Sequence, residues 1–387
     1  MSRRKTTPVE ANDTVTTPSS AGDPWIFGVL VALLLLGVLM VYSSSTAVSL
    51  DRHGTPHHFL LKHCAGLVVG LIAMVGLWRL PYRLLDSSAI VHGLWGSCTL
   101  MLAFTLTQPE VSGASRWIRW HGLSLQPSEL AKIAVILLCA FQLSRRADRL
   151  DDPWRGLAPP VLLVGQLAFL VALQPDFGTT AMLVLLLVVA CFLAGTPWSL
   201  LFKLAGGAVA VLGVYMIQEP YRWVRLRAFV EPSFDPLGAN FQLRQALIAI
   251  GTGGLVGRSH EGLVGTGFGC SLQKLFFLPE PHTDFVFAVI GEELGLFGTL
   301  LVLVLHGTLL LRGLHVAAMA PDLFGGLVAA GSACVIGLQA LVNIMVVVGL
   351  LPTKGIPLPF LSAGGSSLLV SCMAGGLLLS VSRHVVR

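Results

Sequence analysis

The sequence predicts an all-α, polytopic integral membrane protein with about ten transmembrane helices. Of its 387 residues, 54% are hydrophobic and only 12% are charged, whereas a soluble domain carries roughly 25% charged residues. A bilayer-crossing helix needs about 20 mostly apolar residues. Segments of that length follow one another along almost the whole chain.

Two regions are expected. Residues 1–24 are rich in Ser, Thr and Pro and predict a disordered cytoplasmic tail, and residues 25–387 predict a single transmembrane domain. The first apolar run is too long for a cleavable signal peptide. A large external loop, about 218–284, separates the seventh span from the eighth. The expected spans are 25–47, 59–79, 88–108, 129–144, 158–174, 178–195, 199–217, 285–312, 323–350 and 365–383.

Basic residues predict the orientation. Arginines near residues 79–83, 145–155 and 383–387 share one side with the amino terminus, and an excess of Lys and Arg marks cytoplasmic loops. We therefore expect both termini in the cytoplasm. The opposite side also carries cations, among them Arg116, Lys132, Arg222, Lys274 and Lys354. Cations kept there against the usual bias indicate an anionic partner, with lipid headgroup contact as the alternative.

Asp284 is the first candidate for chemistry. The run His282-Thr283-Asp284-Phe285 lies where a polar loop meets a membrane-length apolar segment. Pro279 and Pro281 stiffen the approach, so the carboxylate should hold a fixed place near the water boundary. An acid there is either an N-terminal helix cap or a reacting group.

The two roles of Asp284 make different demands on its pKa. A helix start stabilises the charged form and lowers the pKa of a carboxyl group. A working base would therefore need the apolar Phe276, Phe277 and Phe285, or bound substrate, to raise the pKa again.

Other polar groups lie at the edges of spans. Glu129 and Lys132, three residues apart, share a helix face and can pair, as a structural ion pair or facing a substrate. Asp176 is near a helix start, where we favour capping. Residues 221–227 interleave cations with aromatics and predict an amphipathic segment, and 242–250 predict a short helix.

Two glycine-rich segments are candidate anion sites. Residues 265–270 give weak evidence for phosphate binding. The entrance Gly364-Gly365-Ser366-Ser367 offers amides and hydroxyls that suit an anion. A re-entrant structural loop is the competing interpretation of the second segment.

These residues together resemble the SEDS family (shape, elongation, division and sporulation), most closely its cell-division branch. The resemblance covers nearly all of the chain after the tail. One departure is Ala363, where the family commonly has Tyr. The matching segments are 116–118, 126–132, 174–179, 221–236, 273–285, 291–295 and 349–367.

The resemblance implies a glycosyltransferase that polymerises lipid II into septal peptidoglycan strands and releases polyprenyl diphosphate. It implies a bacterial cytoplasmic (inner) membrane location at the division septum. Implied partners are lipid II, a class B penicillin-binding protein, other division proteins and membrane lipids, with no nucleic acid. A lipid II flippase is the alternative, but the spans show no obvious inverted repeat and the reactive-looking group is not at the midplane.

Within this family, Asp284 is expected to act as general base on the 4-hydroxyl of the acceptor sugar. Arg or Lys side chains, or a divalent cation such as Mg²⁺ or Mn²⁺, would offset the charge of the departing diphosphate; no organic cofactor is implied. The residues expected to bind substrate or shape the cavity are Arg116, Trp117, Glu129, Lys132, Asp176, Arg222, Lys274, His282, Thr283, Lys354, Ser366 and Ser367.

Overall fold

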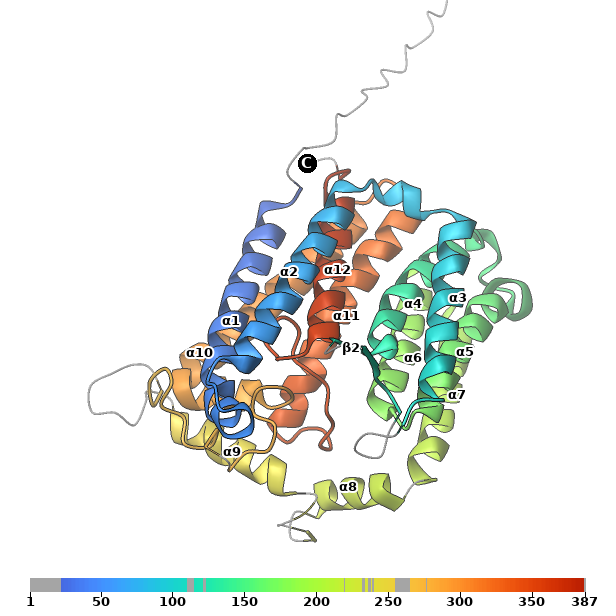
Figure 1. Cartoon of the computed structure of the whole chain (residues 1–387). Coiled ribbons are helices and arrows are strands. Elements are labelled where there is room, and N and C mark those ends of the chain that lie inside the picture. The colour runs from blue at the N-terminus through green and yellow to red at the C-terminus, as the bar shows by residue number, and fades with distance from the viewer. Residues whose placement is uncertain are drawn as a thin grey trace, which may run out of the picture.

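The computed structural model describes residues 22–109, 115–120, 123–218, 220–231, 234–235, 238, 240–254, 265–275 and 277–385. Most of the predicted tail and Phe276 lie outside these residues. Within them, the chain forms a bundle of helices that run side by side (Figure 1).

The ten expected spans are present as apolar helices. Nine segments in the described part are long and apolar enough to cross a membrane, and α6 is a shorter apolar helix of 17 residues. The helices are α1 (Pro24–His53), α2 (His58–Arg79), α3 (Ser88–Thr105), α4 (Pro127–Ser144), α5 (Ala158–Leu173), α6 (Phe177–Leu193), α7 (Trp198–Ile217), α10 (Val286–Ala318), α11 (Leu323–Val347) and α12 (Gly365–Ser382). The α1 helix continues six residues beyond the expected end at 47.

Short elements connect the spans. The single-turn segments η1 (Tyr82–Leu85), η2 (Ala147–Arg149) and η3 (Pro153–Leu157) lie at one end of the bundle, which we call the terminal face (Figure 1). The opposite end, the loop face, carries the antiparallel strands β1 (Ile118–Trp120) and β2 (Leu123–Leu125) and the helices α8 (Pro220–Val230) and α9 (Phe241–Gly253). The last two are the amphipathic segment and the short helix expected in the long loop.

The ends of the described chain meet at the terminal face. Asp23 caps α1 by accepting from the amides of Trp25 and Ile26. Its own amide donates to Ser382 Oγ at 3.1 Å, and its carboxylate pairs with Arg312. The start of α1 and the end of α12 therefore share one side, as an even number of spans requires.

The centre of the bundle is formed by α4, α11 and α12, whose side chains are mostly buried, whereas α7 buries only Leu201. The α4 helix is buried although it carries Glu129 and Lys132. Charges at such depth are costly unless they are paired, so the partners of these two side chains are part of the packing.

The α10 helix is broken, in contrast to the continuous span expected from hydropathy. Gly295 has φ 61° and ψ −153° inside it, and this conformation leaves carbonyl groups without helical partners. The amides of Thr266 and Gly267 donate to the carbonyls of Glu292 and Glu293 at 2.9 and 3.1 Å. The glycine-rich segment at 265–270 thus closes on α10, and these two amides are not free for a phosphate.

The segment before α12 re-enters the bundle, so the structural interpretation of this loop is confirmed. Leu358, Phe360 and Leu361 are at most 1% exposed, and Phe360 has φ 66°. Its carbonyl lies against α1 at Gly37, where any side chain would clash with it. The ring of His306 on α10 lies 3.3 Å from the carbonyl oxygen of Pro359.

Candidate active site at the loop face

Asp284 lies at the loop face immediately before α10, but it does not cap the helix. The N-cap residue is Phe285, and no side chain makes a capping hydrogen bond there. Among the described residues, no hydrogen bond or ion pair holds the half-buried Asp284 carboxylate. Its Oδ2 lies against Gly355, 2.6 Å from the place where a Cβ of that residue would be. The carboxylate is therefore available to a ligand.

The surroundings of Asp284 favour a base of moderate strength. Burial and, to a smaller extent, the nearby Glu280 carboxylate raise the pKa of Asp284, Arg225 opposes both, and the result is a pKa of about 6. Phe285 is 3% exposed and contributes to this burial, whereas Phe277 is largely exposed. The protein without substrate thus already raises the pKa that the helix start was expected to lower.

Lys354 packs against the start of α6. Its ammonium lies 4.7 Å from the centroid of the Phe177 ring, and its Cε lies close to Gly178 at the start of α6. Burial lowers the pKa of Lys354 to about 7; Arg116, Arg222 and Arg225 act in the same direction and Asp176 opposes them. Within the described part of the chain, no carboxylate lies within ion-pair distance of this ammonium.

The guanidinium groups near Lys354 are attached to main-chain carbonyls. Arg116 donates to the carbonyls of Gln174 and Pro175 at 2.9 and 2.6 Å. Arg222 donates to the carbonyl and the hydroxyl of Tyr215 at 2.7 and 2.8 Å. Arg225 donates to the carbonyl of Thr353 at 3.0 Å. These bonds fix the positions of the positive charges around Lys354 and join three separate segments of the loop face.

Asp176 is a helix cap, as favoured from the sequence. Its carboxylate accepts from the amide and the hydroxyl of Thr179 at 3.3 and 2.8 Å. A further bond, 3.4 Å long, comes from Gln126 Nε2 in front of α4. Asp176 therefore holds the start of α6, on which Lys354 packs.

Glu129 and Lys132 form the expected ion pair. Lys132 Nζ lies 2.7 Å from Glu129 Oε1, and the two side chains are 3% and 5% exposed. Lys132 Nζ also donates to Gln339 Oε1 at 2.7 Å, and Gln339 Nε2 donates to Ser367 Oγ at 3.3 Å. The pair links α4 to α11 and α12 and is almost inaccessible.

Ser366 at the entrance of α12 is also engaged. Its hydroxyl accepts from the amide of Gln126 at 2.9 Å and lies 3.4 Å from the carbonyl of Ser124. Ser366 and Ser367 therefore both tie α12 to neighbouring segments.

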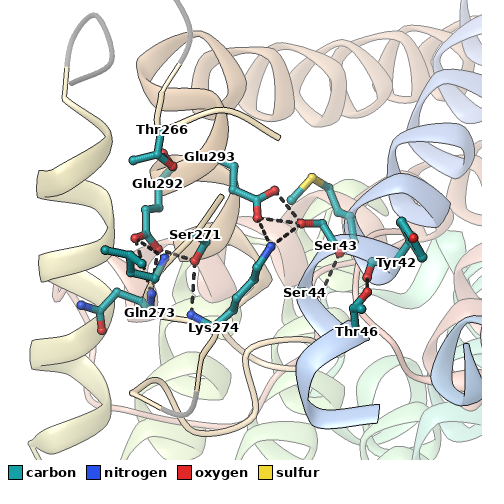
Figure 2. Close-up of polar contacts among 12 residues, drawn as sticks. Tyr42, Ser43, Ser44, Thr46, Thr266, Ser271, Gln273, Lys274, Glu292 and Glu293 are labelled. Carbon is teal, nitrogen blue, oxygen red and sulfur yellow. Dashed lines mark hydrogen bonds and ion pairs between the residues drawn. The ribbon is translucent and has the colours of Figure 1, made fainter. Parts of the chain in front are cut away.

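Lys274 also makes contacts that stabilise the fold. Figure 2 shows its ammonium between Glu293 of α10 and Ser43 of α1, at 2.7 and 3.0 Å. The Ser43 hydroxyl also lies 2.6 Å from Glu293 Oε1, and Lys274 and Glu293 are almost inaccessible. This cation, expected at the substrate, instead neutralises a buried carboxylate.

The adjacent Glu292 holds the loop in front of Lys274. Its carboxylate accepts from the Ser271 hydroxyl and from the amides of Leu272 and Gln273 (Figure 2). Both acidic residues of this turn of α10 therefore anchor the segment that leads toward Asp284.

His282 and Thr283 flank Asp284 on its amino-terminal side. His282 is 3% exposed and packs on Phe59, with 4.6 Å between the ring centroids. Burial lowers the pKa of His282, with Glu280 opposing and Arg52 acting in the same direction. Thr283 Oγ1 donates to the carbonyl of Glu280 at 3.3 Å. Trp117 is half-buried beside β1.

Two residues that the sequence interpretation missed contact this site. Gln339 and Asn343, one turn apart on α11, are 3% and 1% exposed. Their amides donate to the carbonyls of Pro357 and Ile356 at 2.9 and 2.7 Å. The sequence does contain a signal for them: two amide side chains lie four residues apart in an apolar span. Polar groups at membrane depth are usually functional.

The fold and the site define a class of protein: a multi-pass membrane protein with clustered cations and a half-buried carboxylate, unbonded among the described residues, at one end of its bundle. The family model of the FtsW/RodA/SpoVE cell cycle proteins matches residues 24–387. The chain belongs to this family.

Relatives and solved structures agree with the assignment. The chain is 38% identical over 359 residues to a probable peptidoglycan glycosyltransferase FtsW of Geobacter metallireducens, with 92% of this chain and 93% of that one covered. It is 38% identical over 374 residues to the corresponding protein of Coxiella burnetii, with 95% and 97% covered.

Two solved structures are similar over the whole bundle. A chain of a peptidoglycan synthase complex, described for coordination of polymerization and crosslinking, superposes with a TM-score of 0.75 at 31% identity, covering 94% of this chain and 98% of that one. The rod shape determining protein RodA of Thermus thermophilus superposes with a TM-score of 0.69 at 29% identity, covering 95% and 99%.

Proposed function

We propose that this chain is a peptidoglycan glycosyltransferase that polymerises lipid II into septal glycan strands, with Asp284 as general base. The observation that carries the role of Asp284 is its carboxylate: it is half-buried, has a pKa raised to about 6, and is free of hydrogen bonds within the described residues. A base with a pKa near the working pH combines ionisation with driving force for proton transfer.

In the proposed reaction, the Asp284 carboxylate accepts the proton of the acceptor 4-hydroxyl. The resulting oxygen nucleophile attacks the anomeric carbon of the donor, and the bond from that carbon to the diphosphate oxygen breaks. The electron pair leaves with the polyprenyl diphosphate. One carboxylate suffices for such an inverting displacement, whereas glycosidases usually use two.

Lys354 is the side chain best placed to offset the charge of the diphosphate. Its ammonium lacks a carboxylate partner within the described residues, and an anion would favour its protonated form and raise its pKa from about 7. Arg116, Arg222 and Arg225 add a fixed positive potential through their anchored positions. Such preorganised charges stabilise a leaving group without reorganisation during the reaction.

A dedicated metal cage is not part of the proposal. The described residues contain no group of three or more His, Cys, Asp or Glu side chains able to hold a metal ion. Mg²⁺ usually binds through one or two carboxylates together with substrate phosphates, so Mg²⁺ or Mn²⁺ would arrive with the diphosphate. Polymerisation that EDTA leaves unchanged would assign the charge offset to the side chains alone; activity lost to EDTA and restored by Mg²⁺ would add the ion.

We further propose that the loop face is extracytoplasmic, that the termini are cytoplasmic, and that the protein acts in the inner membrane at the septum. A class B penicillin-binding protein would crosslink the new strands, in a division complex with other proteins. The basic terminal face and the similarity to a chain of a peptidoglycan synthase complex support this arrangement.

The test is polymerisation of purified lipid II by the protein together with its transpeptidase partner. Asp284→Asn should lower the rate about 10²- to 10⁴-fold, the range for loss of a general base. Asp148→Asn, which changes an exposed carboxylate of η2 on the terminal face, should leave the rate unchanged. Equal rates for Asp284→Asn and the wild-type protein would refute the assignment of the base.

A further inference from the structure

Asn343 of α11 bonds to the main chain on both sides of the candidate site. Its Nδ2 donates to the carbonyl of Asp284 at 2.9 Å and to the carbonyl of Ile356 at 2.7 Å. A carboxamide nitrogen has two protons, so each proton serves one carbonyl. One side chain thus joins the segment before α10 to the re-entrant segment.

This link controls where the Asp284 carboxylate lies. No side-chain bond within the described residues orients that carboxylate, so its position follows from the main chain that carries it. Its Oδ2 is against Gly355, the residue directly before Ile356. Asn343 therefore fixes the two backbones between which the carboxylate is held.

The orientation of the Asn343 side-chain amide costs stability, and this cost supports its role in holding the two backbones. Asn343 Oδ1 is buried and has no partner within the described residues, and an unpaired buried acceptor destabilises a fold. The reverse orientation would place Oδ1 against two carbonyl oxygens. The residue therefore serves as a double donor.

We propose that Asn343 is a positioning residue for the glycosyl transfer step, acting through the main chain of Asp284. The inference rests on the proposed function of Asp284. It assigns no contact with substrate to Asn343, which is 1% exposed. Arg116 is anchored to the turn between α5 and α6 and Arg222 to α7, outside the segment that Asn343 holds, so substrate affinity should depend on Asn343 less than the rate of the transfer step does.

The experiment compares Asn343→Leu with Gln339→Leu in the lipid II polymerisation assay. Both variants remove an amide from the same face of α11 and a bond to the re-entrant segment, but only Asn343 reaches Asp284. Asn343→Leu should lower kcat about 100-fold, the effect of a misplacement near 1 Å, with a smaller change in KM. Gln339→Leu should keep a kcat within about tenfold of the wild-type value, although it also loses a partner of Lys132.

The pH profile separates positioning from a general loss of structure. A displaced Asp284 carboxylate loses burial, so the acidic limb of kcat/KM should move below pH 6 in Asn343→Leu and stay in place in Gln339→Leu. If thermal unfolding shows that Asn343→Leu is not folded, Asn343→Ala removes both donors without adding a charge or a larger side chain. Here the expected results are the same loss of kcat and the same shift.

Two results would overturn the inference: a wild-type kcat in a folded Asn343 variant, or equal losses in the two leucine variants. A failure of the proposed glycosyltransferase function would give results different from these two. In that case the wild-type complex forms no glycan, or Asp284→Asn polymerises normally, whatever the Asn343 variants do.

Discussion

Asp284 owes its proposed basicity to burial near Glu280. Because the pKa is about 6 in the folded protein, the carboxylate is ionised above pH 6 and becomes protonated as the pH falls through this value. We expect kcat/KM for lipid II polymerisation to fall tenfold per pH unit below about 6, since this parameter reports the free enzyme. A flat profile down to pH 4 would contradict a base with this pKa.

Lys354 should produce the alkaline limb of the pH profile of kcat/KM. Its pKa of about 7 means that the free protein loses this positive charge as the pH rises through 7. Arg is always charged in proteins, so Lys354→Arg should remove the alkaline limb of kcat/KM and leave the acidic limb in place. An alkaline limb that persists in Lys354→Arg would assign that limb to another group.

At the scale of the element, α4 is held by its buried ion pair. Lys132→Met leaves the Glu129 carboxylate buried without its cation. Breaking a buried ion pair costs about 3–5 kcal/mol. We expect a clearly lower unfolding temperature in detergent, together with reduced activity. The matched variant is Lys203→Met on the exposed α7, where a surface change should stay within about 0.5 kcal/mol. Equal tolerance of the two changes would remove a structural role for the pair.

The re-entrant segment depends on close contact with α1. A Cβ at Gly37 would clash with the carbonyl of Phe360, whereas a Cβ at Gly28 of the same helix meets nothing within 4 Å. Gly37→Ala should therefore destabilise by about 1–3 kcal/mol, as overpacking does. Gly28→Ala should be neutral or slightly stabilising, because Ala is the better helix former. Thermal unfolding of both variants tests the difference, and an undisturbed Gly37→Ala would mean that the segment can move away.

For the whole molecule, the competing function is transport of lipid II between leaflets. The carboxylate of Asp284 and the ammonium of Lys354, neither of them in an ion pair with any described residue, both lie at the loop face, not at the middle of the bundle where transporter sites usually lie. In vesicles containing labelled lipid II, we expect glycan from the protein and its partner, without partner-independent exchange between leaflets. Exchange without glycan would favour the flippase.

The features that the sequence predicted correctly are those that depend on residues close together in the chain. The ten spans, the helix in residues 220–230 and the cap at Asp176 depend on neighbouring residues, so composition and spacing could predict them. The Glu129–Lys132 pair was predictable for the same reason, because its members lie on one helix face. Asp284 was found because it lies at a boundary between polar and apolar segments.

By itself, the sequence determined the membrane class, the spans and the family, and it singled out Asp284 as the candidate base. Only the tertiary structure decided that Asp284 is not a cap and that Lys274 is held by Ser43, 231 residues away in the chain. It also decided the break at Gly295, the re-entrant segment and the bridge made by Asn343. The physical reason is that a buried polar group must be satisfied, and which distant group meets it is set by how the helices pack.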